Sequence, residues 1–145
     1  MVEGGDAEEI AETIGQKKTP GANTYGTTSQ SYTDPRTGVS YVIDYFTLDY
    51  EAITVTVDVT SGTGWNTNTI VAIQEAVAAY VNSLGIGEDL EFNRLYRPAY
   101  LNGSAEGLTY TITGLQVNGG TSNVSVDFNK AADMEASDVT VNVTP

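Results

Sequence analysis

The chain has 145 residues, about the length of one domain, and its 40% hydrophobic and 17% charged residues are typical of a soluble globular protein. Nineteen acidic residues against six basic ones give a formal charge of −13, which argues against nucleic acid as a ligand. The sequence shows no secretory signal, no cysteine and no apolar run near the roughly 20 residues of a membrane span, so we expect no membrane contact and no disulfide.

A short helix is predicted near the start of the chain, over residues 6–17. Asp6, followed three residues later by Glu9, resembles a capping box, and Pro20-Gly21 ends the apolar periodicity. The next stretch, from Gly21 to Ser40, is rich in Gly, Ser, Thr and Asn and has no period. We therefore expect an extended arm there rather than a packed element.

Two strands and a long helix are predicted next. Apolar residues alternate over 39–46 and over 52–60, and the second run has valines on one side and polar side chains on the other. A glycine-rich turn breaks the second strand. A helix then follows, capped by Asn66 or Thr67, with apolar residues at i, i+3 and i+4 spacing as far as Leu84. We expect this helix to pack on the apolar face of the preceding strand.

The last third of the chain predicts mainly strands. Residues 93–102 are compatible with a short helix or a loop, because Pro98 would kink or shorten a helix. Alternation then predicts strands over 108–117, 124–128 and 139–143, with a hairpin turn between the first two. The element order indicates an α+β fold: a mostly antiparallel sheet with one long amphipathic helix packed on it, preceded by a short helix and an extended arm.

The stretch Gly85-Ile86-Gly87-Glu88-Asp89 could be a phosphate cradle, a metal loop or the end of the long helix. A phosphate cradle needs glycines before a helix N-terminus, whereas these glycines follow a helix C-terminus. Gly85 is suited to the left-handed position that closes a helix, with Ile86 folding back on the last turn and Gly87 allowing a second bend. We therefore interpret Gly85 and Gly87 as turn residues.

Catalytic residue types are scarce. Histidine and cysteine are both absent, which rules out a Ser-His-Asp triad and the common zinc sites. Carboxylate pairs are possible in principle, but no spacing selects a pair, and no stretch has the ligand order of a calcium loop. We expect no catalytic, cofactor-binding or metal-binding residues, although four acidic residues remain candidates: Glu88, Asp89, Asp127 and Asp133.

Four residues are candidates for a protein interface. Trp65 lies between a glycine-rich turn and a helix start, where it can pack over the helix N-terminus or anchor a partner. Tyr25, Tyr32 and Arg36 lie in the predicted arm, and an unpacked arm can reach a neighbouring protein and become ordered there.

Two long segments carry a resemblance to a known family. The stretch VEGGDAEEIAETIGQKKTPGANTYGTTSQSYTDPRTGVSYVIDYF is similar to the middle segment of Mu-type baseplate J-like proteins of contractile phage tails. It has the same glycine-rich start, the Ile-Ala helix, the Lys-x-Pro-Gly exit, and then a turn and a strand. The stretch ITVTVDVTSGTGWNTNTIVAIQEAVAAYVNSLGIGEDLEFNRL resembles the C-terminal part of the family. The chain therefore looks like the C-terminal half of such a protein, with residues 1–50 as the middle segment and 51–145 as a C-terminal α+β domain.

The resemblance implies a structural role without catalytic residues or cofactors. Baseplate wedge proteins associate laterally around a tail hub, so the implied partners are other baseplate or tail proteins and copies of the chain itself. The implied location is the virion tail baseplate, assembled in the cytoplasm of the bacterial host. Pro98 and the insertion LNGSAEG depart from the family pattern, which has a short helix followed closely by a Gly-Val turn.

Two other classes of function remain open. A secreted or surface-displayed adhesive or glycan-binding module is indicated by the threonine-rich strand face, the nine tyrosines and the acidic composition. The long central helix argues against the β-sandwich common in that class. An enzyme would have only its carboxylates for chemistry.

Overall fold

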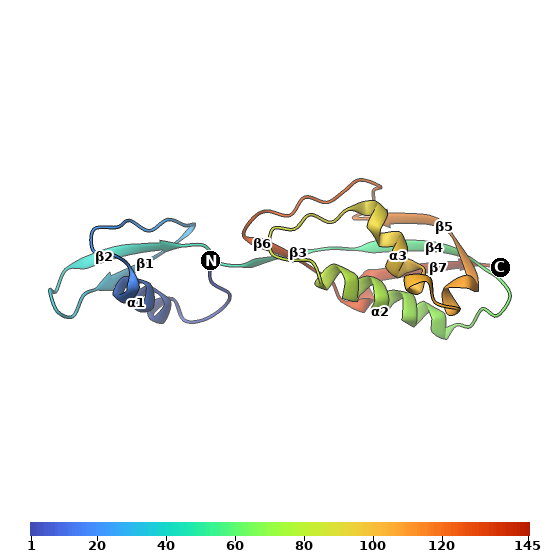
Figure 1. Ribbon diagram of the computed structural model, residues 1–145, viewed down its shortest axis with the longest axis horizontal. Coiled ribbons are helices and arrows are strands. Elements are labelled where there is room, and N and C mark those ends of the chain that lie inside the picture. The colour runs from blue at the N-terminus through green and yellow to red at the C-terminus, as the bar shows by residue number, and fades with distance from the viewer. The chain divides into compact units, whose positions relative to one another are not determined.

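The chain folds as a mixed α+β protein, seen in the computed structural model that describes residues 1–145 (Figure 1). It divides into two units, Met1–Asp49 and Tyr50–Pro145, and each unit has a hydrophobic core of its own. The division lies one residue before the boundary that the sequence analysis placed after residue 50.

The first unit begins with helix α1, Ala7–Lys17, as predicted. The Asp6 carboxylate caps this helix by accepting hydrogen bonds from the backbone N–H groups of Glu8 and Glu9, at 2.9 and 3.3 Å. Such a cap satisfies donors that have no partner inside the helix, and a negative charge is favourable at this end. The local sequence signals therefore fix both the presence and the start of α1.

The prediction of an unpaired arm from Gly21 to Ser40 is wrong for its second half. Strand β1, Thr28–Thr33, pairs antiparallel with β2, Ser40–Tyr45, and forms a two-stranded sheet. Burial alternates along β1, but most of its inward side chains are polar, so apolar periodicity does not reveal the strand. A turn joins the two strands, and the Asp34 carboxylate accepts a hydrogen bond from the Arg36 N–H at 2.8 Å.

The core of the first unit is small. Ala11, Ile43 and Tyr45 are buried, and Tyr32 packs against them together with Val2, Ile10 and Ile14. Gly15 makes this packing possible, because a Cβ at that position would lie 2.4 Å from the ring of Tyr32. The close approach of helix and strand therefore requires a residue without a side chain.

The second unit is built on a three-stranded sheet with the strand order β5-β4-β7. The central strand β4, Val55–Ser61, pairs antiparallel with β5, Tyr110–Val117, and parallel with β7, Val139–Thr144. The mostly antiparallel single sheet of the sequence analysis is therefore not what the structure has. The strands form three small sheets, and the largest is mixed in direction.

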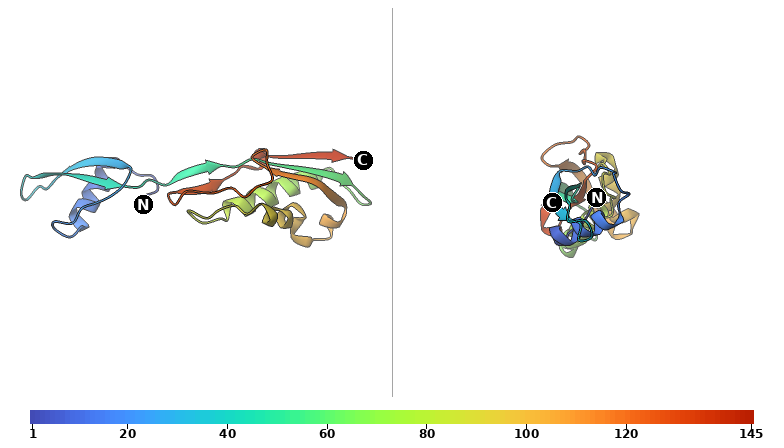
Figure 2. Two further views of the ribbon diagram at one scale, coloured as in Figure 1. Left: turned by 90° about the horizontal axis from the view of Figure 1, so that it is seen from above. Right: turned by 90° about the vertical axis from the view of Figure 1, so that its left-hand side faces the viewer.

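Helices cover one face of this sheet (Figures 1 and 2). Helix α2, Asn68–Asn82, buries Ile73, Val77 and Val81 in one core with the valines of β4. Burying such side chains contributes roughly 1.5–3 kcal/mol each. The Asn66 side chain accepts a hydrogen bond from the Asn68 N–H at 2.9 Å, which makes it the polar group at the start of the helix.

Residues 93–102, whose sequence is compatible with a helix or a loop, lie in a series of short helical turns. A 3₁₀ helix, Phe92–Leu95, leads into helix α3, Tyr96–Ala99, and another 3₁₀ helix, Leu101–Gly103, follows. Pro98 lies in the first turn of α3, where its missing N–H leaves no intrahelical hydrogen bond unmade. Proline therefore shortens this helical region without excluding it.

The strand predicted over 124–128 does not form. Val124 makes only an isolated bridge to Leu90, and the next strand is β6, Lys130–Asp133, which pairs with β3, Asp49–Ala52. β5 is irregular at its centre, since its pairing with β4 shifts register beside Gly114. A short 3₁₀ helix, Ala136–Asp138, precedes β7.

The end of α2 differs from the predicted glycine cap. Gly85 does not have a positive φ, whereas Gly87 does, at 69°. The N–H of Ser83 closes the helix by bonding to the carbonyl oxygens of Ala79 and Tyr80, both at 3.1 Å. Ile86 does not fold back on the helix, because 54% of its surface is exposed. The left-handed turn therefore comes two residues later than the sequence suggested.

The two glycines after α2 should differ in their effect on stability. We expect Gly87→Ala to lower the free energy of unfolding by about 1–2 kcal/mol, because a Cβ at this positive φ is strained and would lie 3.1 Å from the Phe128 backbone. Gly85→Ala should change it by less than about 0.5 kcal/mol, because φ is negative there and the nearest atom belongs to the flexible Glu88 side chain. Urea unfolding of both variants measures the difference, and equal losses would contradict it.

Candidate functional site

The loop after α2, which raised the question of an anion or metal site, binds another part of the chain. Gly87 donates its N–H to the carbonyl oxygen of Lys130 at 2.8 Å. Leu90 and Val124 exchange two backbone hydrogen bonds of 2.9 Å. The Asp89 carboxylate accepts from the Val126 N–H at 2.8 Å. These bonds hold segment 124–130, which has almost no regular structure, against the loop.

Three of the four acidic residues that were candidates for chemistry have partners within the protein, and the fourth, Asp133, is exposed on β6. The Glu88 carboxylate accepts a hydrogen bond from the Gly85 N–H at 2.7 Å. Asp127 lies 3.6 Å from the Lys130 ammonium, which also contacts Glu51 at 3.2 Å. The hydrogen bond to Glu51, then its charge and that of Asp127, raise the pKa of Lys130. No group of three or more acidic side chains is placed to hold a metal ion.

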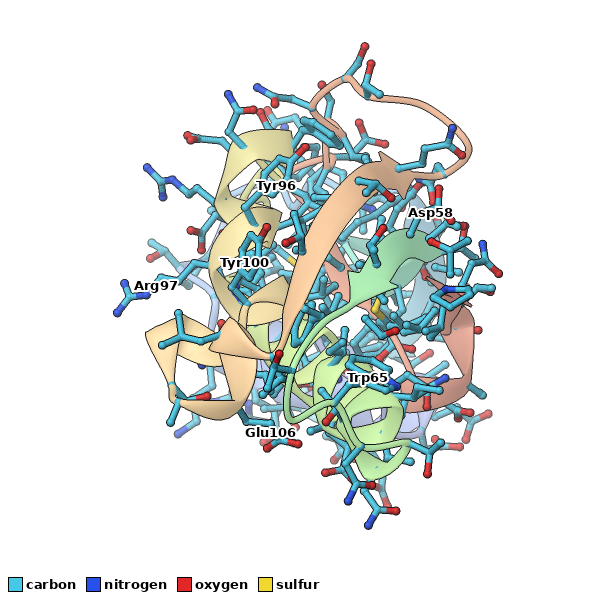
Figure 3. All side chains as sticks on the ribbon, turned by 90° about the vertical axis from the view of Figure 1, so that its right-hand side faces the viewer. Asp58, Trp65, Tyr96, Arg97, Tyr100 and Glu106 are labelled. Atoms are coloured by element: carbon cyan, nitrogen blue, oxygen red, sulfur yellow. The ribbon has the colours of Figure 1, made fainter.

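Trp65, one of the four predicted interface residues, packs inside the second unit. Its ring meets the ring of Tyr110 edge-on, with centroids 5.5 Å apart, and Tyr110 stacks on Tyr100 at 5.7 Å. The Tyr110 hydroxyl donates to the Ala99 carbonyl oxygen, and the Tyr100 hydroxyl accepts from the Ile112 N–H at 2.9 Å. Figure 3 labels Trp65 and Tyr100. This aromatic cluster joins the start of α2, the α3 region and β5.

Two more acidic side chains in Figure 3 also have internal partners. Glu106 accepts a hydrogen bond from the hydroxyl of Thr69 at 2.8 Å, and Thr69 is a fully buried polar residue of α2. Asp58 accepts from the Asn142 amide at 2.7 Å across the sheet. A buried hydroxyl is costly without a partner, so Glu106 stabilises the helix start.

The other three predicted interface residues lie in the first unit, around two neighbouring depressions. The larger has a volume of about 510 Å³ and is lined by Tyr25, Tyr41, Lys18 and Asp44 among others. Tyr25 is 77% exposed, and the Lys18 ammonium lies 5.2 Å from the centre of the Tyr41 ring. Lys18 and Tyr41 also line the smaller depression, together with Tyr32 and Arg36.

Helix α3 exposes two residues that the sequence pattern does not single out. Tyr96 is 37% exposed, and its ring packs edge-on against Phe92. Arg97 makes no ion pair or hydrogen bond, and Figure 3 shows its side chain pointing away from the protein. Tyrosine and arginine are enriched at protein interfaces, so their presence in the motif LYRPAY is compatible with a contact surface. The sequence does not show which of these residues are exposed, because it is compatible with both a helix and a loop here.

Comparisons with known proteins do not assign a family. The chain matches no known protein family, and a search of curated proteins finds no significant match. None of the helices is both long and apolar enough to cross a lipid bilayer.

The aromatic cluster should make the free energy of unfolding depend on pH in the alkaline range. Burial, with smaller contributions from Tyr100 and Glu106, raises the pKa of Tyr110 to about 12 from the ordinary value of 10. The folded state therefore holds the phenol proton more tightly than the unfolded state does. We expect this contribution to stability to be complete below pH 10 and to disappear as pH rises through about 12, a loss of about 2–3 kcal/mol.

Urea unfolding at a series of pH values up to 12 tests this expectation. Tyr110→Phe should be less stable at neutral pH, because the Ala99 carbonyl oxygen loses its partner, and should lack the Tyr110 part of the alkaline loss. Tyr25→Phe is the matched control, since the Tyr25 side chain is largely exposed and its loss should leave the profile unchanged. An identical alkaline loss in Tyr110→Phe would contradict the assignment.

Proposed function

We propose that the chain is a non-enzymatic structural component of a phage or prophage contractile-tail baseplate and forms wedge or ring contacts with neighbouring baseplate subunits. In this proposal residues 1–50 correspond to the middle segment of baseplate J-like proteins and residues 51–145 to their C-terminal domain. β4 is the valine-rich strand of that domain and α2 its long amphipathic helix. The implied place is the tail baseplate, assembled in the bacterial cytoplasm.

The observation that carries the proposal is how the chain uses its polar and aromatic side chains. Acidic groups that could do chemistry bond internally, as Glu88, Asp89 and Glu106 do. Large side chains suited to protein contacts, such as Tyr25 and Tyr96, lie on the surface instead. This contrast supports binding of other proteins rather than catalysis.

Each unit has an exposed surface that is a candidate for protein contacts. In the first unit it is the depression around Tyr25, Tyr41 and Lys18. In the second unit it is the exposed part of α3, with Tyr96 and the unpaired Arg97. Contacts through both units would hold the two parts of the chain to neighbouring subunits. The charge of −13 makes nucleic acid an unsuitable partner for either surface.

Purified tail particles test the proposed function. We expect mass spectrometry to find this protein in intact tails, and Arg97→Ala to lower the amount incorporated because an interface arginine is lost. Lys17→Ala is the matched control, since it removes the same charge from the exposed end of α1. Intact tails that lack the protein would overturn the proposal, while equal incorporation of both variants would reject only the α3 surface.

A second candidate function, an adhesive or glycan-binding module, rests on the depression of about 510 Å³ in the first unit. Tyrosine rings offer flat apolar surfaces with a polar edge, and Asn23 and Asp44 add groups that can bond to hydroxyls. The volume lies within the range of small-ligand sites.

A glycan array probed with the whole chain distinguishes this alternative from the baseplate role. If the module binds glycans, Tyr25→Ala should lose the signal by at least roughly tenfold, because an exposed aromatic surface is removed from the depression. Ile86→Ala, on an exposed loop of the second unit, should leave it unchanged. An array without hits would dispose of the alternative.

A further inference from the structure

The two outer strands of the main sheet are protected very differently. The outer edge of β5 is interrupted by the register shift beside Gly114, and the Ile112 N–H is occupied by the Tyr100 hydroxyl. The outer edge of β7 has neither feature. Outside β4, its backbone makes two hydrogen bonds, both at its first residue: the Gln74 side chain donates to the Val139 carbonyl oxygen at 2.8 Å, and the Val139 N–H donates to the Ala136 carbonyl oxygen. Figure 2 shows β7 as the outermost strand.

The sequence of β7 has none of the features that protect strand edges. VTVNVT contains no charged residue, no glycine and no proline. Natural proteins commonly block open edges with lysine, proline, bulges or covering segments, because unpaired N–H and C=O groups bind other strands. An uncharged, β-branched edge strand is therefore suited to accept another strand.

An exposed apolar patch accompanies this edge on the side of α2. Val139 is buried on that side, and strand alternation places Val141 and Val143 on the same face. Val143 is 37% exposed. On α2, Gln74 bonds to Val139, and Val71 lies one turn earlier on the same side of the helix, 51% exposed. Val71, Val141 and Val143, which we call the valine patch, would be covered by an added strand.

We propose that the β7 edge binds the β7 edge of a second copy of this chain, antiparallel and about a twofold axis. This inference deepens the proposed function by naming one contact surface. Pairing centred on Asn142 sets Val141 opposite Val143 of the second copy, and Thr140 opposite Thr144 of the second copy. Both valine patches then lie on the α2 side of one continuous six-stranded sheet. β-branched cross-strand pairs of this kind stabilise sheets.

Charge explains why a second copy can pair here although each chain carries −13. Neither strand brings a charge into the contact, and Asp58 on the neighbouring strand is already bonded to Asn142. The remaining repulsion comes from charges outside the strands, such as exposed Glu75 one turn along α2 from Val71, and is screened by salt. A six-residue strand with a small valine patch covers less than the roughly 1,000 Å² of a stable interface, so the dimer should be reversible and stronger in salt.

Sedimentation velocity of the full chain over a concentration series, at low and moderate salt, tests the inference. We expect a monomer–dimer equilibrium whose dimer fraction rises with both concentration and salt. Val143→Lys and Val71→Lys should each weaken the dimer at least roughly tenfold, although each reduces the net repulsion between copies. Leu108→Lys is the matched control, because Leu108 is 83% exposed outside β7 and the charge change is identical.

Circular dichroism melting of the same variants shows that they remain folded, which both exposed positions should allow. A chain that stays monomeric at the highest concentration, or a dimer that Val143→Lys leaves as strong as Leu108→Lys does, would overturn the inference. These outcomes are distinct from failure of the baseplate proposal, which depends on the protein being present in tails. A monomeric chain found in tails would reject only the β7 contact.

Discussion

The second unit depends on the two-sided character of β4. Val55, Val57 and Val59 are at most 1% exposed, while the residues between them are polar and lie on the opposite face. The apolar side forms one core with α2, and both backbone edges of β4 are paired, one with β5 and one with β7. Shifting this strand by one residue would exchange its two faces and expose the valines, so its alternation fixes the register of the whole sheet.

Elements with a strong local pattern were predictable, and elements defined by distant pairing were not. The cap at Asp6, the alternation in β4 and the valines of β7 are local, and each marks an element that the structure contains. β1 was missed because its inward side chains are mostly polar, although Tyr32 reaches the small core of the first unit. β6 was missed because KAAD carries no alternation and forms a strand only against β3.

Strand direction and the roles of acidic residues also depend on partners far along the sequence. Nothing within VTVNVT shows that it runs parallel to β4. Asp89 accepts from the Val126 N–H, 37 positions away, and the same separation joins Thr69 and Glu106. The acidic residues alone are compatible with carboxylate chemistry or with a loop that binds a metal ion. In the folded chain these carboxylates accept hydrogen bonds from other parts of the protein instead. The glycine-rich loop after α2 holds segment 124–130 in place through backbone hydrogen bonds.

Charge and strand edges together decide how such a chain can associate. A net charge of −13 repels approaching copies at a distance, which favours solubility over uncontrolled assembly. Repulsion is weaker at the contact itself, because the residues of the β7 edge and the valine patch carry no charge. The register shift and the Tyr100 hydroxyl leave β5 much less able to take the same contact. Within the main sheet, the uncharged and uninterrupted edge of β7 would therefore favour strand pairing at a defined place, which is what an assembly of fixed geometry requires.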